Sequence, residues 1–172
     1  MFKLIGAILL ISTCGYVGWQ VSRSYAHRPV ELRQFMSALQ MLETEIIYAA
    51  TPLPDALSGI AERVDTRVSS FFAQAAKELK TTRGSSAREA WSAALDRYRA
   101  DSTLDRGDLG ILNSLGYNLG ISDRDDQAKH LRLTLEQLKM AHARAEETAV
   151  KNVKLWNYVG LLGGMIIVLA LY

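Results

Sequence analysis

The sequence contains one cysteine and three prolines among its 172 residues. A single cysteine excludes an intrachain disulfide and any zinc or iron–sulfur site built from several cysteines. Charge of one sign is not in excess either, because 20 Lys and Arg stand against 18 Asp and Glu. Proteins that bind nucleic acid through its backbone carry a strongly basic surface. We therefore expect no nucleic-acid partner.

Motifs for catalysis or cofactor binding are also missing. The chain has three histidines, and two of them, His130 and His142, lie about 120° apart around one predicted helix, so they cannot share a metal. Asp123, Asp125 and Asp126 form an acidic run. The segment lacks the glycine at the sixth position and the glutamate at the twelfth position that a calcium loop requires. No GxxxxGK[ST] phosphate loop occurs. We expect no metal, no cofactor and no enzymatic activity.

Charged side chains are nearly absent from both ends of the chain. Apart from Lys3, none lies outside residues 23–154. Leu4–Ser22 and Leu155–Tyr172 are uncharged runs of 19 and 18 residues, and a helix needs about 17–25 apolar residues to cross a bilayer. The sequence predicts transmembrane helices at 1–22 and 155–172, with a domain of residues 23–154 between them.

Basic residues predict the orientation of these two helices. They follow the first run at Arg23, Arg28 and Arg33 and precede the second at Lys139, Arg144, Lys151 and Lys154. Because Lys and Arg beside membrane helices stay in the cytoplasm, we expect the middle of the chain to be cytoplasmic and both termini to lie across the membrane.

The first run has a second interpretation as a secretory signal. Ile11, Ser12, Thr13 and Cys14 resemble a lipoprotein cleavage box. The threonine before the cysteine, the apolar residues beyond it and the basic residues that follow argue against cleavage. Whether the run is ever cleaved stays open at this point.

Between the two runs, hydrophobic periodicity predicts helices and no strand. We expect helices over about 24–50, after Pro52 and Pro54, over 68–79, from Ser86, over 109–119, and from residue 122 into the second run. Ser86 and Glu89 have capping-box spacing. Trp91 is expected to be buried between helices. The predicted fold is an all-α bundle of about six helices.

Two corners separate the longest helices from the others. Thr51, Pro52 and Pro54 predict a turn, since Pro is readily accepted in the first turn of a helix. Gly120 predicts the end of the fifth helix, because it lacks the Cβ that disfavours the left-handed conformation. If the two longest helices run antiparallel, these corners lie together at the end farthest from the membrane.

That end is the candidate surface for a protein partner. Six acidic residues are expected to gather there, namely Glu43, Glu45, Asp55, Asp123, Asp125 and Asp126. Charged rims steer protein association. The alternative is that these carboxylates only hydrate the surface and favour the helix dipoles.

Small residues with a spacing of four occur in both apolar runs, at Cys14 and Gly18 and at Gly160 and Gly164. This spacing lets membrane helices approach closely, so we expect these residues to pack the two helices together. The alternative is that glycines are simply common in such helices.

Two stretches and the glycine-bearing terminal run point to a known family. The stretches are RPVELRQFMSALQMLETEIIYAATPLPDAL at Arg28–Leu57 and LGYNLGISDRDDQAKHLRLTLEQL at Leu115–Leu138. Over essentially its whole length the chain resembles the stage III sporulation protein AB family of endospore-forming bacteria. That family is in turn similar to the cytoplasmic F domain of the platform proteins of type II secretion and type IV pilus machines, whose turn-and-helix pattern TPLPDAL matches.

The resemblance implies a scaffold of the channel that the mother cell builds into the membranes around the forespore. Its implied partners are a secretion-type ATPase of the same operon, ring-forming membrane components and the lipid bilayer. The secretion platform has two such domains and three spans, whereas this chain has one domain and two spans, so the resemblance leaves open whether the chain is a homo-oligomer. The competing function is a membrane-anchored regulator or sensor that relays a signal through its long helices.

Overall fold

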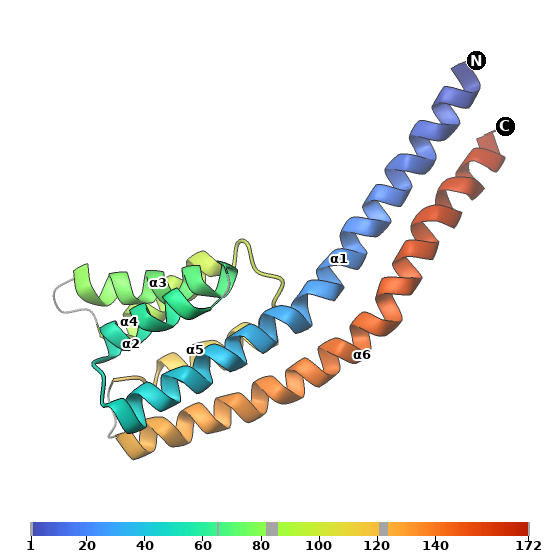
Figure 1. The fold of residues 1–172 in the computed structure, drawn as a ribbon. Coiled ribbons are helices and arrows are strands. Elements are labelled where there is room, and N and C mark those ends of the chain that lie inside the picture. The colour runs from blue at the N-terminus through green and yellow to red at the C-terminus, as the bar shows by residue number, and fades with distance from the viewer. Residues whose placement is uncertain (1, 65, 82–85, 121–123, 172) are drawn as a thin grey trace. The chain divides into compact units, whose positions relative to one another are not determined.

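The structure, a computed structural model, describes residues 2–64, 66–81, 86–120 and 124–171. Over these residues it has six α-helices, one π-helical segment and no strand (Figure 1). The order is α1 (Phe2–Thr44), η1 (Glu45–Ala49), α2 (Leu53–Arg63), α3 (Thr66–Thr81), α4 (Ala87–Tyr98), α5 (Arg106–Gly116) and α6 (Arg124–Leu171). The all-α prediction is confirmed, and the element beyond the six expected is η1.

The described chain forms two compact units. The bundle unit is Val30–His142, and the terminal-helix unit consists of residues 1–29 and 143–172. Helices α1 and α6 contribute to both units. The bundle unit is shorter than the 23–154 segment expected between the spans, because residues 23–29 and 143–154 group with the terminal helices.

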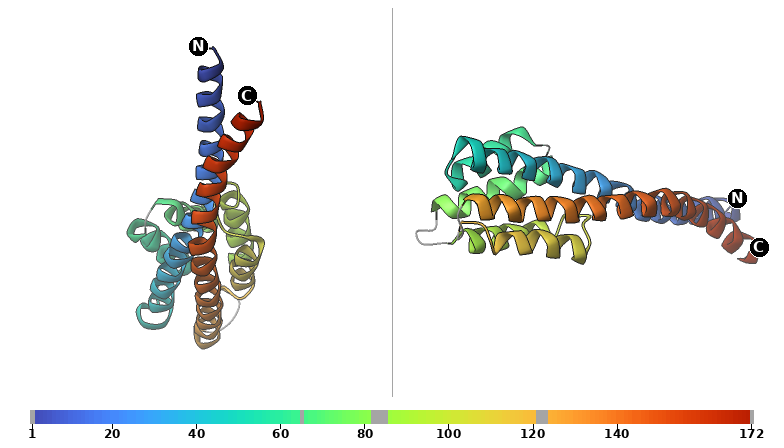
Figure 2. Two further views of the ribbon diagram at one scale, coloured as in Figure 1. Left: turned by 90° about the vertical axis from the view of Figure 1, so that its right-hand side faces the viewer. Right: turned by 90° about the horizontal axis from the view of Figure 1, so that it is seen from below.

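Within the bundle unit, α2 packs against α3, α3 against α4, and α4 against α5. The parts of α1 and α6 that belong to this unit lie side by side (Figures 1 and 2), and Arg132 of α6 donates a hydrogen bond to Glu43 of α1. An aromatic cluster fills the core. The ring centroids of Phe71 and Trp91 lie 4.8 Å apart, and the ring planes are at 90° to each other. Aromatic pairs prefer this edge-to-face geometry. Trp91 is 1% exposed, so its predicted burial is confirmed.

Local signals set the helix starts. The capping box predicted at Ser86 and Glu89 is present, with both reciprocal hydrogen bonds formed. A second capping box, between Asp105 and Asp108, opens α5 at Arg106. The sequence had predicted that this helix begins at residue 109. Helix α5 begins earlier because the Asp105 carboxylate accepts a hydrogen bond from the Asp108 amide at 2.9 Å. Amides in the first turn of a helix have no partner within the helix, and this bond supplies one.

The helix ends depart further from the expectation. Helix α5 stops at Gly116, not at residue 119, and residues 117–120 form a turn that ends at Gly120 with a φ of +78°. The α-helical part of α1 stops at Thr44, and η1 continues it to Ala49. Ala50 then takes the left-handed conformation with a φ of 51°. Left-handed alanine is uncommon because its Cβ approaches the backbone.

In the terminal-helix unit, the two helices run antiparallel and side by side (Figures 1 and 2). A hydrogen bond of 3.4 Å joins the hydroxyl of Ser22 to the backbone oxygen of Val153. A hollow of about 260 Å³ lies between the helices and is lined by Thr13, Cys14, Val17, Gly18, Trp156, Val159, Gly163 and Ile167. Of the four packing candidates, Cys14 and Gly18 thus face α6. Gly160 and Gly164 lie at positions for which no contacts are described.

No helix in the described part of the chain is both long enough and apolar enough to cross a membrane. The spans expected at 1–22 and 155–172 include positions whose side chains lie outside the described residues, namely 1–8, 10–11, 157, 160–161, 164 and 170–172.

Candidate partner-docking surface

The two corners singled out in the sequence lie together in the bundle unit. Around a hollow of about 230 Å³ the structure places Ile46, Ala50, Thr51, Pro52, Leu53, Gly120 and Gln127. These residues come from η1, the turn before α2, the first residue of α2, the corner after α5 and the first turn of α6. We call this the corner surface. Tyr48, in η1 just before this turn, is 80% exposed.

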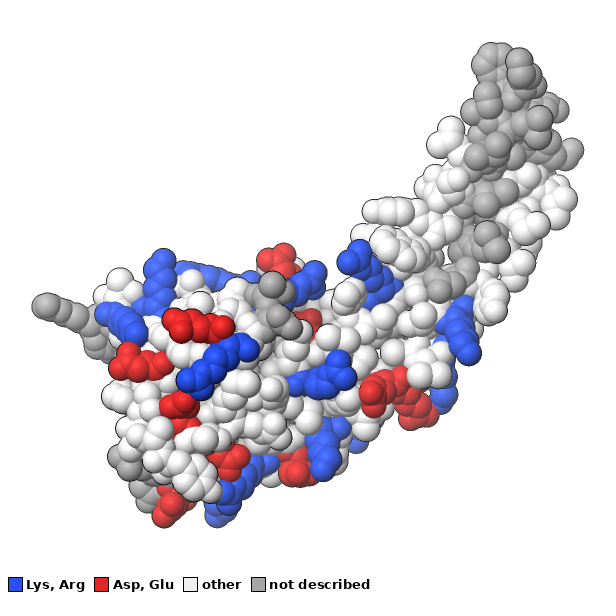
Figure 3. All heavy atoms as spheres, in the orientation of Figure 1, with Lys and Arg blue, Asp and Glu red and all other residues white. Residues whose placement is uncertain are grey.

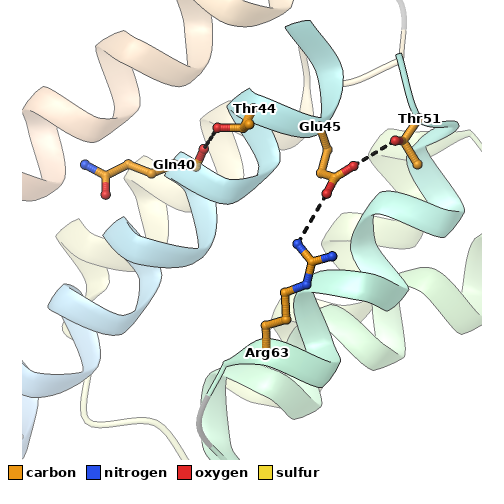
Figure 4. A network of polar contacts seen from close by, with 5 residues as sticks. All are labelled: Gln40, Thr44, Glu45, Thr51 and Arg63. Atoms are coloured by element: carbon orange, nitrogen blue, oxygen red, sulfur yellow. Dashed lines mark hydrogen bonds and ion pairs between the residues drawn. The ribbon is translucent and has the colours of Figure 1, made fainter. Parts of the chain in front are cut away.

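Glu45 organises the turn (Figure 4). One carboxylate oxygen accepts a hydrogen bond from the Thr51 hydroxyl at 2.7 Å, and the other pairs with the Arg63 guanidinium at 3.4 Å. Its backbone oxygen accepts from the amides of Ala50 and Thr51. Thr44, one residue earlier, donates to the backbone oxygen of Gln40. Glu45 therefore ties the end of α1 to α2, and its carboxylate is already occupied.

Two more of the expected docking acids are also paired with bases from other helices. Glu43 accepts from Arg132 of α6 at 2.5 Å, and this hydrogen bond, together with the negative charge of Glu43, raises the pKa of Arg132. Asp55 pairs with Lys80 of α3 at 2.9 Å. Surface pairs of this kind contribute little to stability, but they neutralise the charge that an acidic docking rim would need.

The remaining acids lie at the start of α6. Asp125 and Asp126 are exposed in its first turn, where the helix dipole favours negative charge. Asp123 lies outside the described residues. Figure 3 shows Asp and Glu interspersed with Lys and Arg over the visible face of the bundle unit. The corner surface is thus an apolar hollow with charged neighbours, and not a purely acidic patch.

A buried carboxylate escaped the sequence reasoning. Glu31 of α1 is 4% exposed and accepts four hydrogen bonds, from the hydroxyls of Tyr98 and Ser102 at 2.5 Å and from the hydroxyl and amide of Thr103 at 2.5 and 2.9 Å. Buried charges are retained when they are hydrogen-bonded in this way. Glu31 therefore anchors the segment between α4 and α5 to α1.

The sequence held a signal for this site. Glu31 precedes Phe35 by four residues, so both lie on one face of the helix, and Phe35 is a core residue. An acid on an apolar helix face predicts buried polar partners. Burial raises the pKa of Tyr98, and the hydrogen bond to Glu31 raises it further.

Two other hollows flank α4. One of about 530 Å³ lies beside α3, with Arg67 and Arg97 in its lining, and one of about 320 Å³ lies beside α5. Arg97 pairs with Glu78 at 3.1 Å, and Arg67 donates to the backbone oxygen of Asp101 at 3.1 Å. Among the described residues, no three His, Cys, Asp or Glu side chains are grouped so as to hold a metal ion.

The fold defines an all-α protein with a helical bundle and a pair of long terminal helices. The family model for stage III sporulation protein AB matches residues 3–172. Stage III sporulation protein AB of Bacillus subtilis (strain 168) is 36% identical over 172 residues, which are 99% of each chain. A solved structure of stage III sporulation protein AB is 35% identical, with a TM-score of 0.68, and the match covers 72% of this chain and 97% of that one. The chain belongs to the stage III sporulation protein AB family, as its sequence motifs had indicated.

Proposed function

We propose that this stage III sporulation protein is a membrane platform of a secretion-like channel between mother cell and forespore. In this role the bundle unit receives a cytoplasmic secretion-type ATPase, and the terminal helices meet the ring components of the channel. The observation that carries the proposal is the combination of family membership with a helical bundle that lies in the sequence between two uncharged runs, Leu4–Ser22 and Leu155–Tyr172. The protein acts as a scaffold without catalysis of its own.

Membrane insertion is supported by the sequence and by exposure. Both uncharged runs are continuous in the printed sequence. In the terminal-helix unit, large apolar side chains are exposed at Leu9, Tyr16, Val17, Trp19, Val150, Leu155, Tyr158, Val159, Leu162, Met165, Ile166, Ile167 and Leu169. So much exposed apolar surface is characteristic of membrane or protein contact. With the basic residues on the inner flanks, the bundle unit faces the cytoplasm of the mother cell.

The orientation can be tested with reporters placed between α3 and α4. A reporter that works only in the cytoplasm should be active when inserted at Gly84, whereas one that requires export should be silent there. Activity of the exported reporter at this position would contradict the proposed orientation.

The corner surface is the proposed docking site for the ATPase. It combines an apolar hollow, an exposed aromatic side chain at Tyr48 and exposed acids at Asp125 and Asp126. Protein interfaces commonly consist of an apolar centre with a polar rim, and Tyr is among the residues that carry most binding energy. Asp123, in the same acidic run, is assigned to the rim on sequence grounds alone.

Capture of the full-length protein from sporulating membranes, with its partners identified by mass spectrometry, tests this proposal. Wild-type protein should retain the ATPase, and Tyr48→Ser or Asp125→Lys should lose it. Glu136→Lys makes the same charge change on an exposed residue further along α6 and should behave as wild type. Capture of signalling proteins in place of an ATPase would favour the alternative, a membrane-anchored regulator.

A further inference from the structure

The two terminal helices change from charged to uncharged at the same level. The hydrogen bond from the Ser22 hydroxyl to the Val153 backbone oxygen places these two residues side by side on antiparallel helices. Three residues before Ser22 lies Trp19, and three residues after Val153 lies Trp156. Each is therefore displaced about 4.5 Å in the same direction along the pair, and the two tryptophans lie at a common level.

A basic residue lies within about one helical turn of each tryptophan in the sequence, Arg23 after Trp19 and Lys154 before Trp156. Arg23 and Lys154 each come one residue after the joined positions. Because the helices are antiparallel, these steps go in opposite directions, and the two residues lie about 3 Å apart along the pair. Over residues 23–29 and 143–154 the chain has five basic residues against two acidic ones. Beyond them, both helices are uncharged as far as Lys3 and Tyr172.

Arg23 is already held in position by neutral groups. Its guanidinium lies 5.2 Å from the centre of the Trp19 ring, and its Nε donates to His27 Nε2 at 2.9 Å. Neither partner is an anion, so the positive charge of Arg23 is oriented but not neutralised by them. Lys151, by contrast, pairs with Glu147 at 2.7 Å. Trp19 is 50% exposed, and Tyr158, two residues after Trp156, is 64% exposed.

We propose that Trp19, Arg23, Lys154 and Trp156 form a belt that binds the phosphodiester headgroups of anionic phospholipids in the cytoplasmic leaflet. Tryptophan prefers the boundary between headgroups and acyl chains. Arg and Lys next to it are attracted to anionic lipid surfaces, and the planar guanidinium matches phosphate oxygens. The belt sets the depth of both helices together, because its members come from both. This inference rests on the membrane insertion proposed above and adds a lipid preference to it.

Quenching of tryptophan fluorescence by brominated lipids tests the belt in the full-length protein reconstituted in vesicles. Trp91 is buried in the bundle unit, so quenching reports on Trp19 and Trp156. Brominated phosphatidylglycerol in a phosphatidylcholine background is compared with brominated phosphatidylcholine in a phosphatidylglycerol background. Wild-type protein should associate with phosphatidylglycerol about thirtyfold more strongly, as expected for two basic residues at an anionic surface.

Variants separate the belt from general electrostatic attraction. In Arg23→Gln with Lys154→Gln the preference should fall to about one, whereas Lys129→Gln with Lys139→Gln, which removes the same charge from the bundle unit, should retain it. Exchange of the two cations, Arg23→Lys with Lys154→Arg, should retain it as well. Inorganic phosphate at matched ionic strength should not compete, and competition by it would overturn the assignment to lipid.

The two proposals fail in different ways. If brominated lipid of either headgroup leaves the fluorescence unchanged, the helices are not inserted and the proposed function fails with the belt. If both lipids quench equally in the wild type, insertion stands and the belt is overturned. A preference for phosphatidylglycerol that persists in the Arg23→Gln, Lys154→Gln variant would also overturn the belt.

Discussion

The indole of Trp91 occupies the space where a side chain at Gly116 would lie. A Cβ at Gly116 would approach the indole Cγ to 2.9 Å, and Cδ1 more closely still. The indole nitrogen donates to the backbone oxygen of Leu112, one turn earlier in α5, at 2.8 Å. The α4–α5 contact therefore depends on a hydrogen bond and on the absence of a side chain at the end of α5.

Gly116→Ala should destabilise the protein by about 2–3 kcal/mol, because the added methyl must displace a packed indole. The control is Gly110→Ala in the same helix, where a Cβ meets no atom within 4 Å. This second change should stabilise by about 0.5–1 kcal/mol through the higher helix propensity of alanine. Urea unfolding of the detergent-solubilised protein measures both, and a similar effect of the two variants would contradict the contact.

Glu31→Gln should also be strongly destabilising. The two oxygens of Glu31 each accept from two donors, Tyr98 and Ser102 on one and the two Thr103 groups on the other. In the glutamine side chain one of these oxygens is replaced by an NH₂ group, so two donors lose their acceptor whichever oxygen it is. The free energy of unfolding should fall by about 2–3 kcal/mol. Glu62→Gln, at an exposed position of α2, should leave the unfolding midpoint unchanged. Equal midpoints for the two variants would refute the anchoring role.

Stability should fall at alkaline pH because of Tyr98. Its pKa is raised in the folded protein by burial and by the Glu31 hydrogen bond, so the folded state holds the proton more tightly than the unfolded chain does. The stabilisation is fully present below the ordinary tyrosine pKa of about 10 and is lost progressively above it. Denaturant unfolding at several pH values should show a shallower alkaline loss for Tyr98→Phe. Tyr48→Phe, at an exposed position, should follow the wild type.

Ala50→Gly should stabilise the turn before α2. Alanine with a φ of 51° carries a steric cost of about 1–2 kcal/mol that glycine avoids, so a net gain of about 0.5–1 kcal/mol is expected after the entropy cost of glycine. The neighbouring Ala49→Gly, inside η1, should instead lower stability by about 0.5–1 kcal/mol. Thermal unfolding should show midpoints that shift in opposite directions, and shifts of the same sign would show that Ala50 is not left-handed.

Much of the fold could be predicted because its signals are local. Helical periodicity, the Ser86–Glu89 capping box and the glycine at position 120 each act within a few residues. The second capping box at Asp105 and Asp108 was equally local, and it was missed because an aspartate stands where the usual motif has Gln or Glu.

The amino-acid sequence by itself determined the helical class, the places where most helices begin, the uncharged chain ends and the family. Tertiary structure alone decided which groups meet. Glu43 pairs with Arg132 across 89 positions, and Glu31 accepts a hydrogen bond from Thr103 across 72. Three of the acids that had suggested an open docking rim, Glu43, Glu45 and Asp55, are therefore paired with basic residues. Glu31, an acid on an apolar helix face, is an anchor. The physical reason is that periodicity identifies the buried face of a helix but not the helix packed against it. Charge pairing, the contact of Gly116 with Trp91 and the shared level of the tryptophan pair all depend on which helices pack together.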